Sequence, residues 1–158
     1  MTTHHKPRTT RFLAAESDTL ALGAALARGV RPGMVIYLCG DLGAGKTTLA
    51  RGLLRGLGVT ERVKSPTFPL VEPYTVSSLY CYHFDFYRFK HANEWTDSGF
   101  RDYFNAESVC LVEWPEKAGD QLPAPDLRIE MSVDGSGRSV TLSADSEKGT
   151  HCLERLAG

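Results

Sequence analysis

The chain has 158 residues, a formal net charge of −1 and a hydrophobic content of 42%. This length suits one domain, residues 1–158, with a hydrophobic core of its own. A near-neutral chain has no overall field that attracts nucleic acid, so any RNA contact has to be local or made through a partner. Its apolar runs are too short to span a membrane, and its polar first residues lack a signal-peptide pattern. We therefore expect a cytoplasmic protein whose residues 1–10 form a disordered leader.

Two strands and a helix are expected near the start of the chain. Arg11–Ala15 is a candidate strand, and Ser17 or Asp18 can cap a helix that reaches Arg28. Met34–Cys39 is a continuous apolar stretch, which is typical of a parallel strand buried on both faces.

A second helix is predicted from about Lys46 to Leu57, because leucine recurs there at every fourth position. Gly58 is a natural end for it. Gly52 and Gly56 weaken the helix by about 1 kcal/mol each relative to alanine, which indicates close packing against a neighbouring element.

The middle of the chain predicts a strand pair, Phe68–Tyr74 with Tyr80–Arg88. In the second strand, tyrosine and phenylalanine alternate with a face that carries His83 and Asp85. The aromatic face fits a core. A carboxylate on the opposite face requires a partner or a function, because aspartate is rarely buried alone.

Further along, His91–Asn105 is expected to be mixed and helical in its latter part. Val109–Val112 predicts a second buried parallel strand, followed by a proline-rich connector, Glu116–Asp126. Leu127–Val133 and Ser139–Ala144 flank a glycine-containing turn and predict an antiparallel hairpin. A short helix ending at Leu156 closes the chain.

Four cysteines, Cys39, Cys81, Cys110 and Cys152, show no C-x-x-C spacing. Three of them fall in predicted buried strands. We interpret all four as reduced core thiols.

Between the first apolar strand and the second helix, Gly40–Thr47 matches G-x-x-x-x-G-K-[ST] in full. Glycines at these positions allow consecutive amides to turn inward around a phosphate, at the positive end of the helix dipole. Lys46 is expected to reach the β- and γ-phosphates, and the Thr47 hydroxyl to hold Mg²⁺. The motif predicts a nucleotide-phosphate site.

Two carboxylates are candidates for the rest of that site. Glu113 directly follows the second apolar strand, and ligands of open α/β sheets bind at this carboxyl edge. Asp85 lies toward the end of another predicted strand, where it can position or deprotonate water. Thr67 is a candidate contact to the γ-phosphate or metal. The alternatives are a surface glutamate at a strand end and, for His83, a packing role or the orientation of Asp85.

Four segments in register, GDLGAGKTT, VKSPTF, YHFDFYR and LVEWPEK, resemble the TsaE (YjeE) family. The resemblance covers nearly the whole chain. It implies an α/β P-loop nucleotide-binding fold, with a parallel sheet core flanked by antiparallel strands and helices. It also implies an ATP-hydrolysing accessory subunit of tRNA threonylcarbamoyladenosine synthesis. Such a subunit acts with a TsaB–TsaD pair and meets tRNA only through that complex.

The resemblance also assigns site residues. The implied catalytic residues are Asp85, Glu113, Thr67 and Lys46, and the implied magnesium ligands are Thr47, Glu113 and Asp85. The implied ATP-binding residues are Gly40, Asp41, Leu42, Gly43, Ala44, Gly45, Lys46, Thr47, Thr48, Thr19 and Trp114.

Two alternatives remain open from the residues alone. A small-molecule kinase uses the same loop, although no arginine-rich lid segment accompanies it here. A nucleotide-gated binding module, with little hydrolysis of its own, fits as well. A regulatory GTPase is disfavoured, because the sequence has no N-K-x-D motif for guanine.

Overall fold

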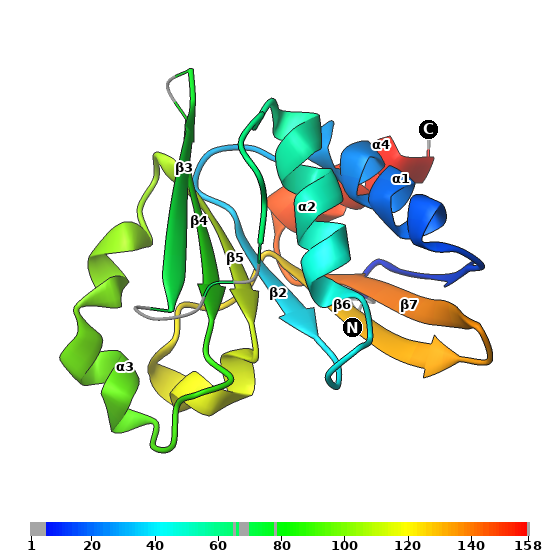
Figure 1. Cartoon of the computed structure of the whole chain (residues 1–158). Helices are drawn as coiled ribbons and strands as arrows, with labels where there is room; N and C mark the ends of the chain where they lie inside the picture. The colour runs from blue at the N-terminus through cyan, green and yellow to red at the C-terminus, as the bar shows by residue number, and fades with distance from the viewer. Residues whose placement is uncertain (1–5, 65, 67–69, 78, 158) are drawn as a thin grey trace, which may run out of the picture.

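The computed structural model describes residues 6–64, 66, 70–77 and 79–157. Within these residues, seven strands form one sheet in the order β1-β7-β6-β2-β5-β4-β3 (Figure 1). The strands are β1 Arg8–Leu13, β2 Val35–Cys39, β3 Val71–Val76, β4 Leu79–Asp85, β5 Ser108–Glu113, β6 Leu127–Asp134 and β7 Gly137–Ala144. The helices are α1 Glu16–Ala27, α2 Lys46–Leu57, α3 Asn93–Ser98 and α4 Glu147–Ala157, with 3-10 helices η1 Phe100–Tyr103 and η2 Pro115–Gln121.

The middle of the sheet is parallel and its edges are antiparallel. β2 pairs in parallel with both β5 and β6, and β4 pairs in parallel with β5. β3, β7 and β1 join by antiparallel pairing. The α/β fold with a parallel core and antiparallel flanks is therefore confirmed.

Helices cover both faces of this sheet, which explains the unbroken apolar runs of β2 and β5. On one face, α1, α2 and α4 pack over an aliphatic core that includes Ile36 and Leu38 of β2. On the other face, the segment containing α3, η1 and η2 covers an aromatic core that includes Phe84, Phe86 and Trp95. Figure 1 shows α3 on one side of the strands and α1, α2 and α4 on the other.

The predicted alternation of β4 is confirmed. Phe84 is buried in the aromatic core, whereas Cys81 is buried in the aliphatic core on the opposite face. His83 shares the face of Cys81 and is also fully buried.

Helices α1 and α2 touch at glycines, as the sequence predicts. A Cβ atom on Gly52 would collide with the backbone oxygen of Leu20 and lie 2.9 Å from its Cα atom. A Cβ atom on Gly56 would lie 2.7 Å from the Cβ atom of Ala27. The glycines are the means by which α2 lies directly against α1.

Several predicted boundaries were wrong. β1 starts at Arg8 rather than Arg11, so residues 8–10 belong to a strand and not to a disordered leader; the strand is paired to β7 and carries little apolar signal. β4 ends at Asp85, because the Asp85 carboxylate accepts a hydrogen bond from the amide of Tyr87 and turns the chain.

Two further segments differ from the expectation. β3 runs to Val76 rather than ending at Tyr74; the expected start at Phe68 lies outside the described residues. Part of the expected connector forms η2, which begins at Pro115, a residue whose fixed φ suits the first position of a helix. The hairpin β6–β7 and the helix α4 are confirmed, and in the described part of the chain no helix is long and apolar enough to cross a membrane.

We expect Gly52→Ala to lower the free energy of unfolding by about 1–3 kcal/mol, although alanine is the better helix former. The added methyl group meets backbone atoms of α1, which cannot rotate away. Urea unfolding measures the change. Arg55→Ala, at an exposed position of the same helix, is the control; equal stability of the two variants would contradict this packing.

The cysteines generate a prediction about pH. Burial raises the pKa of Cys81 and Cys152 from 9.0 to about 11 and that of Cys110 to about 12. Above pH 9 the unfolded chain loses thiol protons that the folded chain keeps, so the free energy of unfolding falls as pH rises from 9 toward these values. Urea unfolding of Cys110→Ala across this range should show a shallower fall. Val112→Ala, a truncation without a titrating group, should keep the wild-type slope.

Candidate active site

The loop between β2 and α2 has the backbone that its glycines predict. Gly40, Gly43 and Gly45 have φ values of 141°, 81° and 101°. A Cβ atom on Gly40 would also collide with the backbone oxygen of Met131 in β6. Positive φ and close backbone approach together require glycine here.

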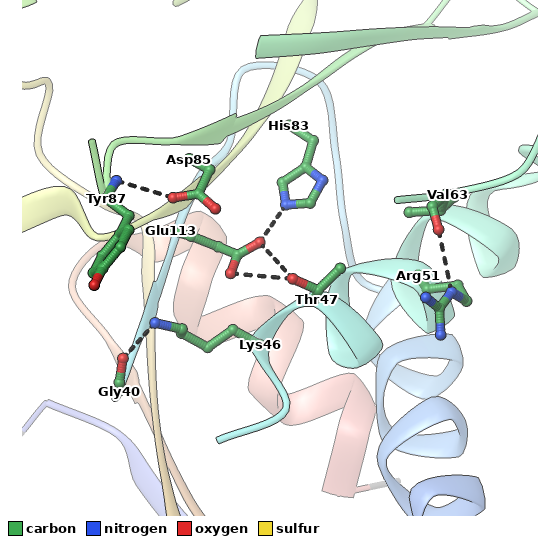
Figure 2. A network of polar contacts seen from close by, with 9 residues as sticks. All are labelled: Gly40, Lys46, Thr47, Arg51, Val63, His83, Asp85, Tyr87 and Glu113. Carbon is green, nitrogen blue, oxygen red and sulfur yellow. Dashed lines mark hydrogen bonds and ion pairs between the residues drawn. The ribbon is translucent and has the colours of Figure 1, made fainter. Parts of the chain in front are cut away.

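Lys46 is the first residue of α2, and only 4% of it is exposed. Its Nζ atom donates a hydrogen bond to the backbone oxygen of Gly40 (Figure 2) and lies 3.8 Å from the ring centroid of Trp114. Burial lowers the pKa of Lys46, and the nearby carboxylates of Glu113 and Asp85 oppose that shift. The ammonium group is held inside the site rather than in water.

Glu113, the last residue of β5, is 3% exposed. Its Oε2 atom lies 2.7 Å from Nε2 of His83, and the Thr47 hydroxyl is 3.1 Å from Oε2 and 3.3 Å from Oε1. A buried carboxylate needs such partners, because leaving it unpaired would be strongly unfavourable. The contacts connect β5 with β4 and with the first turn of α2.

Asp85 is the last residue of β4 and lies directly opposite Glu113 in the parallel pairing of β4 with β5. Its Oδ1 atom accepts a hydrogen bond of 2.9 Å from the amide of Tyr87. Figure 2 shows Asp85, Glu113, Thr47 and Lys46 gathered between the strand ends and the start of α2. The two carboxylates thus reach the same place from neighbouring strands.

These side chains line a cavity of about 310 Å³. Its lining residues are Leu42, Gly43, Ala44, Gly45, Lys46, Thr47, Thr48, Asp85, Glu113, Trp114 and Arg138. A second cavity of about 280 Å³ lies between the start of α1 and the β6–β7 hairpin, and it is lined in part by Thr19, which is 3% exposed. Gly45, Thr48 and Arg138 line both cavities, so the two are adjacent.

Trp114 has a backbone conformation that is unusual for a bulky residue, with φ of 58° and ψ of 49°. This left-handed turn follows Glu113 and places the indole ring over Lys46 and 5.0 Å from the ring of Tyr87. Backbone strain of this kind is concentrated at functional sites, where the surrounding structure holds it in place.

The structure therefore brings together most of the residues that the sequence singled out. Asp41 is exposed, and Leu42 is 65% exposed at the rim of the first cavity. Thr67 lies outside the described residues. The pairing of His83 with Glu113 and the position of Arg138 were missed: the partner of His83 lies on another strand, and Arg138 reaches the site through the order of strands in the sheet.

An open α/β sheet with a parallel core and a polar cavity at the carboxyl edge of that core defines a broad class of ligand-binding proteins. Comparison with known proteins narrows this broad class to one family. The family model described as "Threonylcarbamoyl adenosine biosynthesis protein TsaE" matches residues 13–140. The chain therefore belongs to the TsaE family.

Individual relatives agree with this assignment. The chain is 39% identical to a tRNA threonylcarbamoyladenosine biosynthesis protein TsaE of Haemophilus influenzae, over 94% of this chain and 97% of the relative. It is 39% identical to the TsaE of Bacillus subtilis, over 89% of this chain and 88% of the relative. The crystal structure of Bacillus subtilis YdiB superposes with a TM-score of 0.83 at 32% identity, covering 98% of this chain and 97% of that one.

Proposed function

We propose that this protein binds ATP with Mg²⁺ and hydrolyses it, as an accessory subunit in the threonylcarbamoyladenosine modification of tRNA beside the anticodon. The observation that carries the proposal is the meeting of Lys46, Thr47, Asp85 and Glu113 around one cavity. The relatives' names, which state threonylcarbamoyladenosine biosynthesis, support the process in which the hydrolysis is used.

The phosphates are assigned to the loop Gly40–Gly45 and the start of α2. Amides of a glycine-rich turn and the positive end of a helix dipole attract anions. Lys46 adds a full positive charge inside the cavity, where low exposure weakens screening by water. Phosphate oxygens would replace the Gly40 carbonyl as the acceptor for its ammonium group.

The donor set at the cavity fits magnesium, which prefers oxygen ligands and is commonly held by one or two carboxylates together with phosphate oxygens. Thr47 and Glu113 already bring a hydroxyl and a carboxylate within hydrogen-bond distance of each other, and Asp85 adds a second carboxylate in the same cavity. Bound there, the ion would neutralise charge on the phosphates. His83 holds the Glu113 carboxylate in place from behind.

Asp85 is the candidate for positioning or deprotonating the attacking water, because it lines the cavity at the end of β4, directly opposite Glu113. The adenosine part of ATP is assigned to the second cavity, where Thr19 is buried beside Gly45 and Thr48. The two cavities in series provide separate places for the two ends of the nucleotide.

A TsaB–TsaD-type heterodimer is the proposed partner, and contact with tRNA is made through that complex. Hydrolysis resets the complex between modification cycles without acting on the tRNA itself. This division agrees with the near-neutral charge of the chain, which provides no general attraction for nucleic acid.

We expect Lys46→Ala to weaken ATP binding by more than about tenfold, because a buried charge-assisted contact to phosphate is lost. Calorimetric titration measures this change in affinity.

Asp85→Ala should keep ATP affinity within about twofold but lower turnover, measured by phosphate release, by about 100-fold or more. Asp97→Ala, which removes an exposed carboxylate outside both cavities, is the control. Wild-type turnover by Asp85→Ala would remove Asp85 from the mechanism.

The function as a whole is tested by measuring ATP hydrolysis with and without the TsaB–TsaD pair, together with formation of threonylcarbamoyladenosine in tRNA. We expect the pair to stimulate hydrolysis and the modification to depend on it. A phosphorylated small molecule among the products would indicate a kinase instead. Nucleotide-dependent association with the pair, without hydrolysis, would indicate a binding module.

A further inference from the structure

Arg138, the second residue of β7, lies where the two cavities meet, although it belongs to none of the sequence motifs. It is opposite Leu13 of β1 and Val133 of β6. Gly45, at the end of the glycine-rich loop, and Thr48 of α2 form one wall of this junction, and the β6–β7 hairpin supplies another from a distant part of the sequence. Arginine is thus placed beside the glycine-rich loop by the order of strands.

The approach of the hairpin to β1 fixes this position. A Cβ atom on Gly137 would lie 2.6 Å from the backbone oxygen of Leu13 and 2.6 Å from the ring of Phe12. Glycine at 137 therefore allows β7 to lie tight against the end of β1. The next residue, Arg138, is directed to the boundary between the cavities.

The guanidinium group has unused hydrogen-bonding capacity. Its Nη1 atom donates to the backbone oxygen of Gly137 at 2.9 Å. Its Nε atom is buried, and among the described residues it has no hydrogen-bond partner. The described ion pairs do not include Arg138. A permanently charged group with five N–H donors and a buried unpaired nitrogen is suited to an anion.

We propose that Arg138 binds the α-phosphate of the nucleotide. This inference rests on the proposed function, because it assumes that the first cavity takes the terminal phosphates and the second the adenosine. In ATP the α-phosphate connects these two parts, and Arg138 with Gly45 and Thr48 lines both cavities. The planar guanidinium group can donate two parallel hydrogen bonds to phosphate oxygens.

The positions of the cations in the two cavities favour the α-phosphate over the γ-phosphate as the group that Arg138 binds. The end of the first cavity near Glu113 and Asp85 already has Lys46 as its cation. The second cavity is lined by Glu16 and Arg138 as its ionisable side chains, so Arg138 is the cation available at the adenosine end. A contact to the α-phosphate is present with both ADP and ATP, and it makes Arg138 a binding residue rather than a transition-state residue.

The test compares ATP and ADP binding by calorimetric titration in Arg138→Ala. We expect both dissociation constants to rise by about tenfold or more and by the same factor, as expected for loss of a charge-assisted contact. Turnover at saturating ATP should stay within about twofold of wild type. Arg138→Lys, which keeps the charge but not the planar fork, should fall between wild type and Arg138→Ala for both nucleotides.

Arg11→Ala is the matched control: it removes a positive charge from an exposed position of the adjacent strand, lines neither cavity, and should leave both affinities unchanged. Weaker binding of ATP alone, or a collapse of turnover, would overturn the proposal in favour of a γ-phosphate contact. Unchanged affinities in Arg138→Ala would overturn it as well. If thermal melting shows that Arg138→Ala does not fold, Arg138→Lys takes its place in the test. Affinities of Arg138→Lys for ATP and ADP equal to those of the wild type would overturn the proposal. Wild-type protein that binds neither nucleotide would overturn the proposed function itself.

Discussion

The candidate site depends on the hydrogen bonds made by the buried carboxylate of Glu113. It is contacted by His83 from β4 at 2.7 Å and by Thr47 from α2 at 3.1 Å. A charge in this position is tolerated only with such partners, so the ends of β4 and β5 and the first turn of α2 are held in one arrangement. That arrangement sets the distance between the glycine-rich loop and the carboxyl edge of the sheet.

The two cores hold this site from opposite faces of the sheet. Glycines in α2 bring its axis against α1, and the aliphatic core then fixes both helices on β2 and β6. On the other face, Phe84 and Phe86 anchor β4 and the turn that follows it, one residue on either side of Asp85. The same strand therefore serves both packing and the site: its aromatic face belongs to the aromatic core, its opposite face brings His83 to the Glu113 carboxylate, and Asp85 at its end lines the cavity.

The sequence predicted correctly those elements whose patterns lie within a short stretch of neighbouring residues. The apolar run of β2, the helix Lys46–Leu57 with Gly58 at its end, and the β6–β7 hairpin agree with the structure. The start of β1 was missed because this strand is stabilised by pairing with β7 and has few apolar residues. The position of Arg138 follows from strand order, which places β6 beside β2 and β7 next to β6, although β6 and β7 come last among the strands. No short sequence pattern encodes that order.

The site also contains features that are unfavourable on their own and are compatible with an anion. Lys46 is buried, with its pKa lowered by desolvation, Nε of Arg138 is buried without a partner among the described residues, and Trp114 has a left-handed backbone conformation. A phosphate chain would satisfy both cations at once, because it brings negative charge and hydrogen-bond acceptors to the same cavity. Residues that lower the stability of the fold are common at functional sites. The strained turn at Trp114 and the two cations lie around one space, and this arrangement supports the proposal that the space binds phosphate.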